Sequence, residues 1–401
     1  MRPLDGIRVL ELSTGIAGPF AGMLLGDYGA EVIKVEPAAG DPARKLPGFV
    51  VWNRNKRSIV LDPGTEAGRQ RLASLVAGAD VCIAADYSLL DALGTAPASL
   101  VRLHMPPYTV AGAPWAGGAE SHGLLTAFGG PSCRQSSFDG GPIDLVYPVA
   151  LYQQGVWGAA CAVAALVERQ QSGQGQTVTV DGLHGVLSTC PGTFVIDPSQ
   201  PVATTDVGPG GRHPTYSTYQ CGDGQWLFLA ALTPKFQKNA FKTLGVGDLH
   251  ADPRIGGLPS RLIQPDNRVW VRQRLAEAFA SRPRDEWLRL LEHGDCPAGP
   301  LHERDAWLDH PQIDVNGLRV ELDDPERGRV MMPGLCIGLA KTPGEIRTPA
   351  PRLGEHTETA ACWAPRADIP APAPADRAAV AGAQSAGRGP LAGLRVLDLG
   401  T

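Results

Sequence analysis

The first 37 residues alternate in a pattern that restricts the fold to a parallel sheet with helical crossovers. Residues 7–12 (IRVLEL) form a nearly continuous apolar run, as in a strand that is buried on both faces. A turn of small residues follows, then a helix that Pro19 can start, and then a second strand at 31–37. Because parallel strands need a long crossover, this order is typical of a strand–helix–strand unit.

Further strand-like runs occupy 58–62, 79–84 and 100–105, with helical stretches between them. This alternation predicts an α/β fold with a doubly wound large domain. From about residue 210 the pattern changes, because Asp223-Gly224 indicates a hairpin and amphipathic helices follow it. We expect a large domain at 1–210, a smaller α+β domain at 211–330, and a return segment at 331–362 that packs with the large domain.

The end of the chain repeats its beginning. Residues 390–401 align with residues 3–14 over 12 positions without a gap, and eight of them are identical; average composition gives roughly one by chance. Residues 363–389 are rich in Ala and Pro, which is typical of a semi-extended linker. We interpret 390–401 as the start of a second repeat unit. Since a lone strand cannot bury itself, we expect Leu394 to Leu399 to be an exposed stub.

Charge and composition exclude several classes of function. The formal net charge of −5 provides no basic field for nucleic acid. No apolar run reaches the ~18–20 residues of a membrane helix, and no signal-peptide pattern opens the chain. The eight cysteines form no CxxC and the histidines no HExxH, so we expect no metal site. Reduced thiols favour a cytoplasmic protein.

The turn after the first strand, Gly15 to Gly18, precedes a helix and is a candidate anion site. A dinucleotide site is one alternative, with Glu36 at the end of the second strand as the ribose acceptor. The full GxGxxG pattern is absent, which favours a tight turn that accepts some other anion.

Several motifs together resemble the family III CoA-transferases, the CaiB–BaiF group. The resemblance covers residues 3 to about 358. It rests on the opening 37 residues and on WNRNKRSIVLD (52–62), ALVERQQSGQGQTVTVD (165–181), GDCPAGPL (294–301) and LGEHT (353–357). It implies a Rossmann-like large domain, a small domain and two interlocked subunits. It also implies transfer of CoA between an acyl-CoA and a carboxylic acid, with CoA as substrate and no tightly bound cofactor.

The family's chemistry depends on an aspartate whose carboxylate attacks the thioester. It lies a fixed distance before a GRGQ-type turn, which here is GQGQ (173–176). Counting back through PVALYQQG (148–155) places Leu151 at the aspartate position. The nearest acid, Asp144, lies seven residues earlier and needs a shift in register. We therefore expect no catalytic residue in this chain and an inactive isolated unit.

The resemblance assigns the CoA contacts to two segments. These contacts are Thr14, Gly15 and Ala17 in the turn, and Lys56, Arg57 and Leu61 in the second motif. Lys56 and Arg57 are also candidates for purely structural ion pairs. Where relatives have an asparagine-containing run and an arginine, this chain has Ala85-Asp86 and Ala92, so cationic pairing with phosphate is lost and repulsion is added.

Three functions stay open. The chain can be the N-terminal, non-nucleophilic half of a tandem CoA-transferase, with the catalytic aspartate in the second half. It can be a scaffold half of the pseudo-dimer without any ligand site. It can also be an acyl-CoA racemase or isomerase, because His122 lies near the position of a catalytic histidine in racemase relatives. Gly208 to Gly211 is either a remnant of the family's mobile glycine loop or an interdomain turn.

Overall fold

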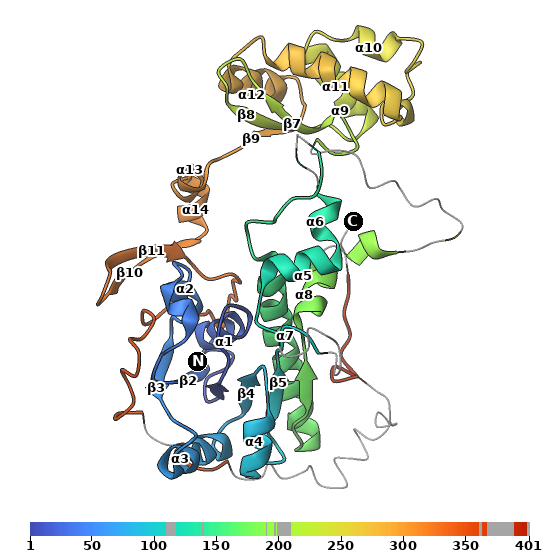
Figure 1. The fold of residues 1–401 in the computed structure, drawn as a ribbon. Coiled ribbons are helices and arrows are strands. Elements are labelled where there is room, and N and C mark those ends of the chain that lie inside the picture. The colour runs from blue at the N-terminus through green and yellow to red at the C-terminus, as the bar shows by residue number, and fades with distance from the viewer. Residues whose placement is uncertain are drawn as a thin grey trace. The chain divides into compact units, whose positions relative to one another are not determined.

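The computed structural model (Figure 1) describes residues 1–109, 118–135, 137, 140–189, 191–195, 198, 210–360, 363–366 and 389–398. Its contacts divide the chain into two compact units. The large unit takes Met1–Gly129, Leu145–Val195 and Asp314–Thr401, and the small unit takes Gly130–Asp144 and Ile196–Ile313. The domain limits expected at 210, 330 and 362 stay a prediction. Gly208, Pro209 and most of the expected linker lie outside the described residues.

A six-stranded sheet forms the centre of the large unit, with the strand order β3-β2-β1-β4-β5-β6. Every neighbouring pair is parallel, so the predicted α/β fold with a parallel sheet is confirmed. The strands are β1 (Arg8–Glu11), β2 (Glu31–Glu36), β3 (Lys56–Val60), β4 (Val81–Ala84), β5 (Val101–His104) and β6 (Thr177–Thr179).

Helices cover both faces of this sheet, so that alternate residues of a strand enter different hydrophobic cores. Val9 belongs to the core beneath α1, α7 and α8, whereas Leu10 belongs to the core beneath α3 and α4. Burial on both faces explains the continuous apolar runs in the sequence. The helices are α1 (Ala17–Asp27), α2 (Phe49–Trp52), α3 (Glu66–Ala77), α4 (Ser88–Leu93), α5 (His122–Gly129), α7 (Val149–Ser172) and α8 (Gly182–Thr189), with the 3₁₀ turns η1 (Pro42–Lys45) and η2 (Pro191–Phe194).

Helix α7 is rich in small residues and leads directly into the GQGQ turn. In the described part of the chain it is also the one helix long and apolar enough to cross a membrane, which the sequence analysis did not expect. Half of its most apolar window is buried inside the protein, as in the core helix of a globular unit. It ends at Ser172, and Gly173 follows as the C-cap with a φ of 76°, the left-handed conformation that favours glycine.

The return segment closes the open edge of the sheet at β3. An antiparallel hairpin, β10 (Arg319–Asp324) and β11 (Gly328–Pro333), leads into this segment. Farther on, the His356 N–H donates to the Ser58 carbonyl at 2.9 Å, and Thr357 Oγ1 accepts from the Val60 N–H at 3.0 Å. The LGEHT motif is therefore an architectural element that satisfies backbone groups of an edge strand.

The small unit contains an antiparallel sheet in the order β7-β8-β9. The hairpin predicted at Asp223-Gly224 connects β7 to β8, with Gly224 at φ 78°. Thr233 caps α9 by accepting from the Phe236 N–H, as its position predicts. The elements are β7 (Tyr216–Gln220), β8 (Trp226–Ala230), β9 (Ala298–Pro300), α6 (Pro131–Arg134), α9 (Pro234–Thr243), α10 (Asp248–Ala251), η3 (Pro259–Arg261), α11 (Pro265–Phe279), α12 (Arg284–His293) and α13 (Arg304–Leu308), with α14 (Pro311–Val315) at the boundary of the unit.

The repeated segment at the end of the chain forms no strand within its described residues, 390–398. Leu394, Val396 and Leu397 are 64%, 90% and 81% exposed. The expected exposed stub is confirmed for these three side chains, and Leu399 lies outside the described residues.

Candidate functional site

The turn between β1 and α1 lies beside a cavity of about 460 Å³. Its position follows from the topology, because β1 pairs with β2 on one side and with β4 on the other. In open parallel sheets, ligands bind beyond the carboxyl ends of the strands at such a point of reversal. The lining residues include Ser13, Thr14, Gly18, Asp86, His104 and Glu120.

The backbone amides of the turn already have carboxylate acceptors. The Gly15 N–H donates to Asp41 Oδ1 at 3.1 Å. The Ile16 N–H donates to Glu120 Oε1 at 2.8 Å, and the Ala17 N–H donates to Glu120 Oε2 at 3.3 Å. The anion that the sequence predicts at the start of α1 is thus supplied by the chain itself. Of the expected contact residues, Thr14 is exposed in the cavity wall, and Gly15 adopts φ 83°.

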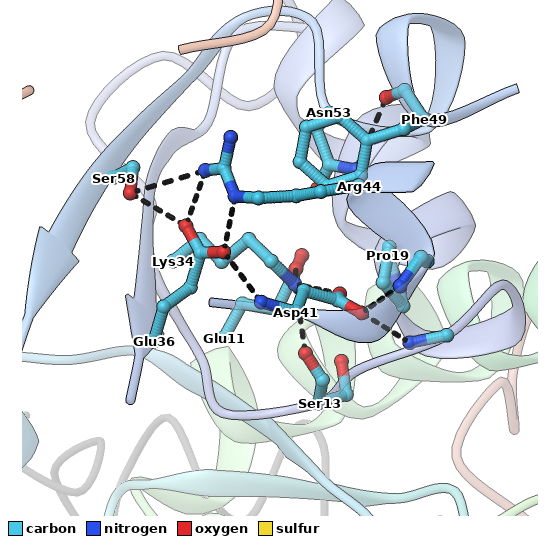
Figure 2. Close-up of polar contacts among 12 residues, drawn as sticks. Glu11, Ser13, Pro19, Lys34, Glu36, Asp41, Arg44, Phe49, Asn53 and Ser58 are labelled. Atoms are coloured by element: carbon cyan, nitrogen blue, oxygen red, sulfur yellow. Dashed lines mark hydrogen bonds and ion pairs between the residues drawn. The ribbon is translucent and has the colours of Figure 1, made fainter. Parts of the chain in front are cut away.

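A buried charge cluster of Glu11, Lys34, Asp41 and Lys56 supports this turn. Figure 2 shows Glu11, Lys34 and Asp41 of this cluster. Lys34 Nζ lies 2.9 Å from both Glu11 Oε1 and Asp41 Oδ2, and it donates to the Ser13 carbonyl at 2.8 Å. Lys56 Nζ lies 2.7 Å from Glu11 Oε2. Two acids and two lysines balance in charge, and Lys34 links strand β2 to the turn through Ser13 and Asp41.

Lys56 has no hydrogen left for a ligand phosphate. Its ammonium donates to Glu11, to the Pro19 carbonyl at 2.8 Å and to Asn53 Oδ1 at 3.0 Å, which uses all three donors. Burial lowers the pKa of Lys56 to about 8, against the opposing effect of Glu11. For Lys34, burial has the same effect, but Glu11 and Asp41 outweigh it and raise the pKa above its usual range. These contacts agree with the structural interpretation of Lys56.

We expect the unfolding free energy of the wild-type chain to rise relative to that of a Lys56→Met variant as pH increases from about 8 to 10.5. In that window the unfolded chain keeps the Lys56 proton and the folded chain releases it, so stability increases with pH by up to about 3 kcal/mol. Urea unfolding of both proteins across this range measures the difference. A difference that is flat or that falls with pH contradicts the prediction.

The other expected contact residues occupy separate environments. Arg57 is half exposed and pairs with Glu31 at 2.8 Å on the surface. Leu61 is buried in the core beneath α3. Glu36, the alternative ribose acceptor, is fully buried and forms hydrogen bonds of 2.8 and 2.6 Å with Arg44. Arg57 and Leu61 do not line the cavity. Glu36 forms an internal ion pair with Arg44.

Leu151 lies in the first turn of α7 and is 2% exposed. It belongs to the same apolar core as Ala17 of α1. Gly155, one turn later, lets the two helices approach, because a Cβ there would lie 2.9 Å from the Ala17 carbonyl oxygen. The PVALYQQG motif therefore fixes the approach of α7 to α1, with a hydrocarbon side chain at the position expected for the nucleophile.

The remaining candidates are distributed over several elements. Asp86 lines the cavity, and hydrogen bonds from Ser88 lower the pKa of its carboxyl. Ala92 is exposed on α4, and His122 is the first residue of α5. Asp144 is exposed and belongs to the small unit.

Sequence reasoning missed Asp41 and Glu120, the two acids that hold the turn. Glu120 lies in a loop next to His122, and no motif marks it. Asp41 follows the second strand after a proline and a glycine, where it also caps η1 by accepting from the Ala43 N–H. The position of Asp41 before Pro42 could have predicted its role as a helix cap. Its hydrogen bond with Gly15 could not be predicted from the sequence.

The chain is similar to known proteins over most of its length. The model of the family described as CoA-transferase family III matches residues 4–357. The chain belongs to the family III CoA-transferases. Succinate–glutarate CoA-transferase of Agrobacterium fabrum is 31% identical over 386 residues, with 88% of this chain and 94% of the relative covered. The mouse succinyl-CoA:glutarate CoA-transferase is 28% identical over 378 residues, with 89% and 85% covered.

Solved structures of this family share the fold of the chain. A CaiB/BaiF family protein from Brucella suis has a TM-score of 0.74 at 28% identity, over 89% of this chain and 97% of that protein. Rv3272 from Mycobacterium tuberculosis has a TM-score of 0.77 at 24% identity, over 90% and 99%. The chain therefore shares the fold of these solved structures over most of its length.

Proposed function

We propose that this chain is a CoA-transferase unit that lacks its own nucleophile and works with a second unit of the family. The reaction moves CoA between an acyl-CoA and a carboxylic acid. Leu151 carries the proposal, because a buried leucine occupies the first turn of α7 where the resemblance expects the attacking aspartate. A hydrocarbon side chain cannot form the covalent intermediate that this chemistry requires.

The second unit would form a family-type interlocked pseudo-dimer with the Rossmann-like large unit. Two observations support it. Eight of 12 residues at the end of the chain repeat its beginning. The helices α5, α7 and α8 also expose large apolar side chains, namely Leu124, Phe128, Val156, Trp157 and Leu187, and exposed apolar groups of this kind mark interaction surfaces. A homodimer partner is the alternative occupant. A cytoplasmic location stays a prediction, which the free thiols of the six described cysteines fit.

A scaffold half without a ligand site is the second candidate function. Two observations favour it. All three hydrogens of the Lys56 ammonium are used in internal hydrogen bonds. The Glu120 carboxylate accepts hydrogen bonds from the Ile16 and Ala17 amides of the turn. The two candidates differ in whether this unit contacts CoA at all.

Mass spectrometry after incubation with succinyl-CoA tests the proposal, with Leu151→Asp and Leu151→Asn compared with the wild-type chain. Succinyl-CoA is the probe because several relatives carry it in their names. We expect no covalent CoA adduct on the wild-type chain or on Leu151→Asn. An adduct on Leu151→Asp alone supports a site that is intact apart from its nucleophile. Absence of both adduct and calorimetric CoA binding in all three favours the scaffold. CoA transfer by the wild-type chain alone, at rates typical of the family, overturns the proposal.

A further inference from the structure

The carboxylate of Glu120 occupies the position where an anionic ligand would meet the start of α1. Both of its oxygens accept hydrogen bonds, one from the Ile16 N–H at 2.8 Å and one from the Ala17 N–H at 3.3 Å. Helix α1 has 11 residues, so its first amides carry the partial positive charge of a helix N-terminus. Bound anions use these same donors.

The fit of Glu120 depends on the glycine at position 15. A Cβ built on Gly15 would lie 2.4 Å from Glu120 Oε1, closer than any real contact of this kind. Glycine at 15 therefore leaves the space that the carboxylate fills. The contact joins residues about 100 positions apart in the sequence, so it is a tertiary contact and not a local turn.

One further donor of the cavity wall is unused. Ser13 is 4% exposed, and its Oγ has no hydrogen-bond partner among the described residues. It lines the same cavity as Glu120. An unpaired buried hydroxyl is costly and indicates a place that a polar ligand can satisfy. Ser13 Oγ and the two amides of α1 together form a set of donors suited to a phosphate or carboxylate group.

The rest of the cavity repels anions. The lining residues in the described part of the chain include the carboxylates of Asp86 and Glu120 but no lysine or arginine. The nearby lysines, Lys34 and Lys56, are buried and fully used by the charge cluster. A negative group that enters must therefore displace Glu120 without help from a lysine or arginine among the described lining residues.

We propose that Glu120 is a built-in anion that closes the α1 N-terminus to external phosphate or carboxylate groups, and that its removal opens an anion site formed by Ile16, Ala17 and Ser13. This inference rests on the second candidate under the proposed function, the scaffold half, and deepens it: Glu120 is the residue that makes the unit reject the anionic part of an acyl-CoA. The carboxylate takes the place of the ligand on the turn, where the Ile16 and Ala17 N–H groups hold it in the space that Gly15 leaves.

Pyrophosphate binding to Glu120→Ala and Glu120→Gln tests the proposal, with Asp86→Asn as the matched control from the same cavity. We expect Glu120→Ala to bind pyrophosphate roughly 10- to 100-fold more tightly than the wild-type chain, since each hydrogen bond to a charged group contributes about one to two factors of ten. The pyrophosphate affinity of Glu120→Gln should lie between those of the wild-type chain and Glu120→Ala, because its amide oxygen still accepts one N–H. Asp86→Asn should change affinity less than about threefold, because it leaves the α1 amides occupied.

Amide NMR shifts of Ile16 and Ala17 locate the binding, and a Glu120→Ala/Ser13→Ala double variant should lose part of the gained affinity. Thermal unfolding of each variant shows that it is folded. Unchanged pyrophosphate affinity in both folded Glu120 variants overturns the proposal, as does an equal gain in Asp86→Asn. Pyrophosphate carries no thioester, so the result is independent of whether the chain transfers CoA.

Discussion

Replacing Arg54 by methionine is expected to lower the unfolding free energy by about 3–5 kcal/mol, as the loss of one partner of a buried ion pair does. Arg54 is 1% exposed, and its Nη2 lies 2.7 Å from Asp27 Oδ2. The same guanidinium donates to the carbonyls of Pro333 and Gly334 at the end of the hairpin β10–β11. The variant leaves Asp27 buried, with the Asn55 amide as its remaining side-chain hydrogen-bond donor among the described residues and with the charge of Arg347 nearby. Urea unfolding followed by circular dichroism measures the change.

Arg57→Met is the matched control for Arg54→Met. Arg57 lies three residues later in the same motif, but its ion pair with Glu31 is half exposed. Exposed pairs contribute about 0–1 kcal/mol, so this variant should unfold close to the wild-type chain. Equal losses from the two arginine substitutions would show that burial does not determine the contribution of Arg54.

A Glu11→Gln substitution should cost a similar amount, about 3–5 kcal/mol. Glu11 is the carboxylate that Lys34 and Lys56 share, with Nζ–O distances of 2.9 and 2.7 Å. Without it, Lys56 loses the carboxylate it contacts, whereas Lys34 keeps its contact with Asp41. Chemical unfolding measures this loss, and Glu31→Gln on the exposed pair is the control.

A double variant separates charge balance from packing in this cluster. Glu11→Gln combined with Lys56→Met restores one lysine to one carboxylate, so we expect it to be more stable than Glu11→Gln alone. Residues that share an ion-pair network are not additive, which makes the comparison informative. Additive losses would falsify the view that balanced charge stabilises the turn.

Much of the parallel sheet could be predicted from the sequence because its strands are buried on both faces and read as continuous apolar runs. The roles of adjacent charged residues could not. Lys56 and Arg57 are neighbours in β3, and the alternation of a strand places one inside and one outside. Which one is buried depends on the pairing of β3 with β2 and on the position of Glu11 in β1, and these are tertiary facts.

The candidate site was predictable in part for similar reasons. The turn at Gly15 was evident, since a strand, a small-residue run and a helix start are local features. Its occupant was not, because Glu120 reaches the turn from a distant loop without a motif. The spacing to GQGQ was enough to match Leu151 to the aspartate position of the family. The burial of Leu151 in the same core as α1 could be seen only from the fold.

The return segment also sets an order in which the chain can finish folding during synthesis. The Asn55 side-chain amide donates to the Glu345 carbonyl, 290 residues farther along the chain. The Ser58 carbonyl likewise accepts a hydrogen bond from the His356 N–H. Until the ribosome has released that segment, β3 presents a bare parallel edge that can pair with other chains. A product cut short before the LGEHT run would keep that edge permanently. We expect such a fragment to aggregate. The large unit therefore completes its folding only after the return segment has been synthesised and has packed against β3.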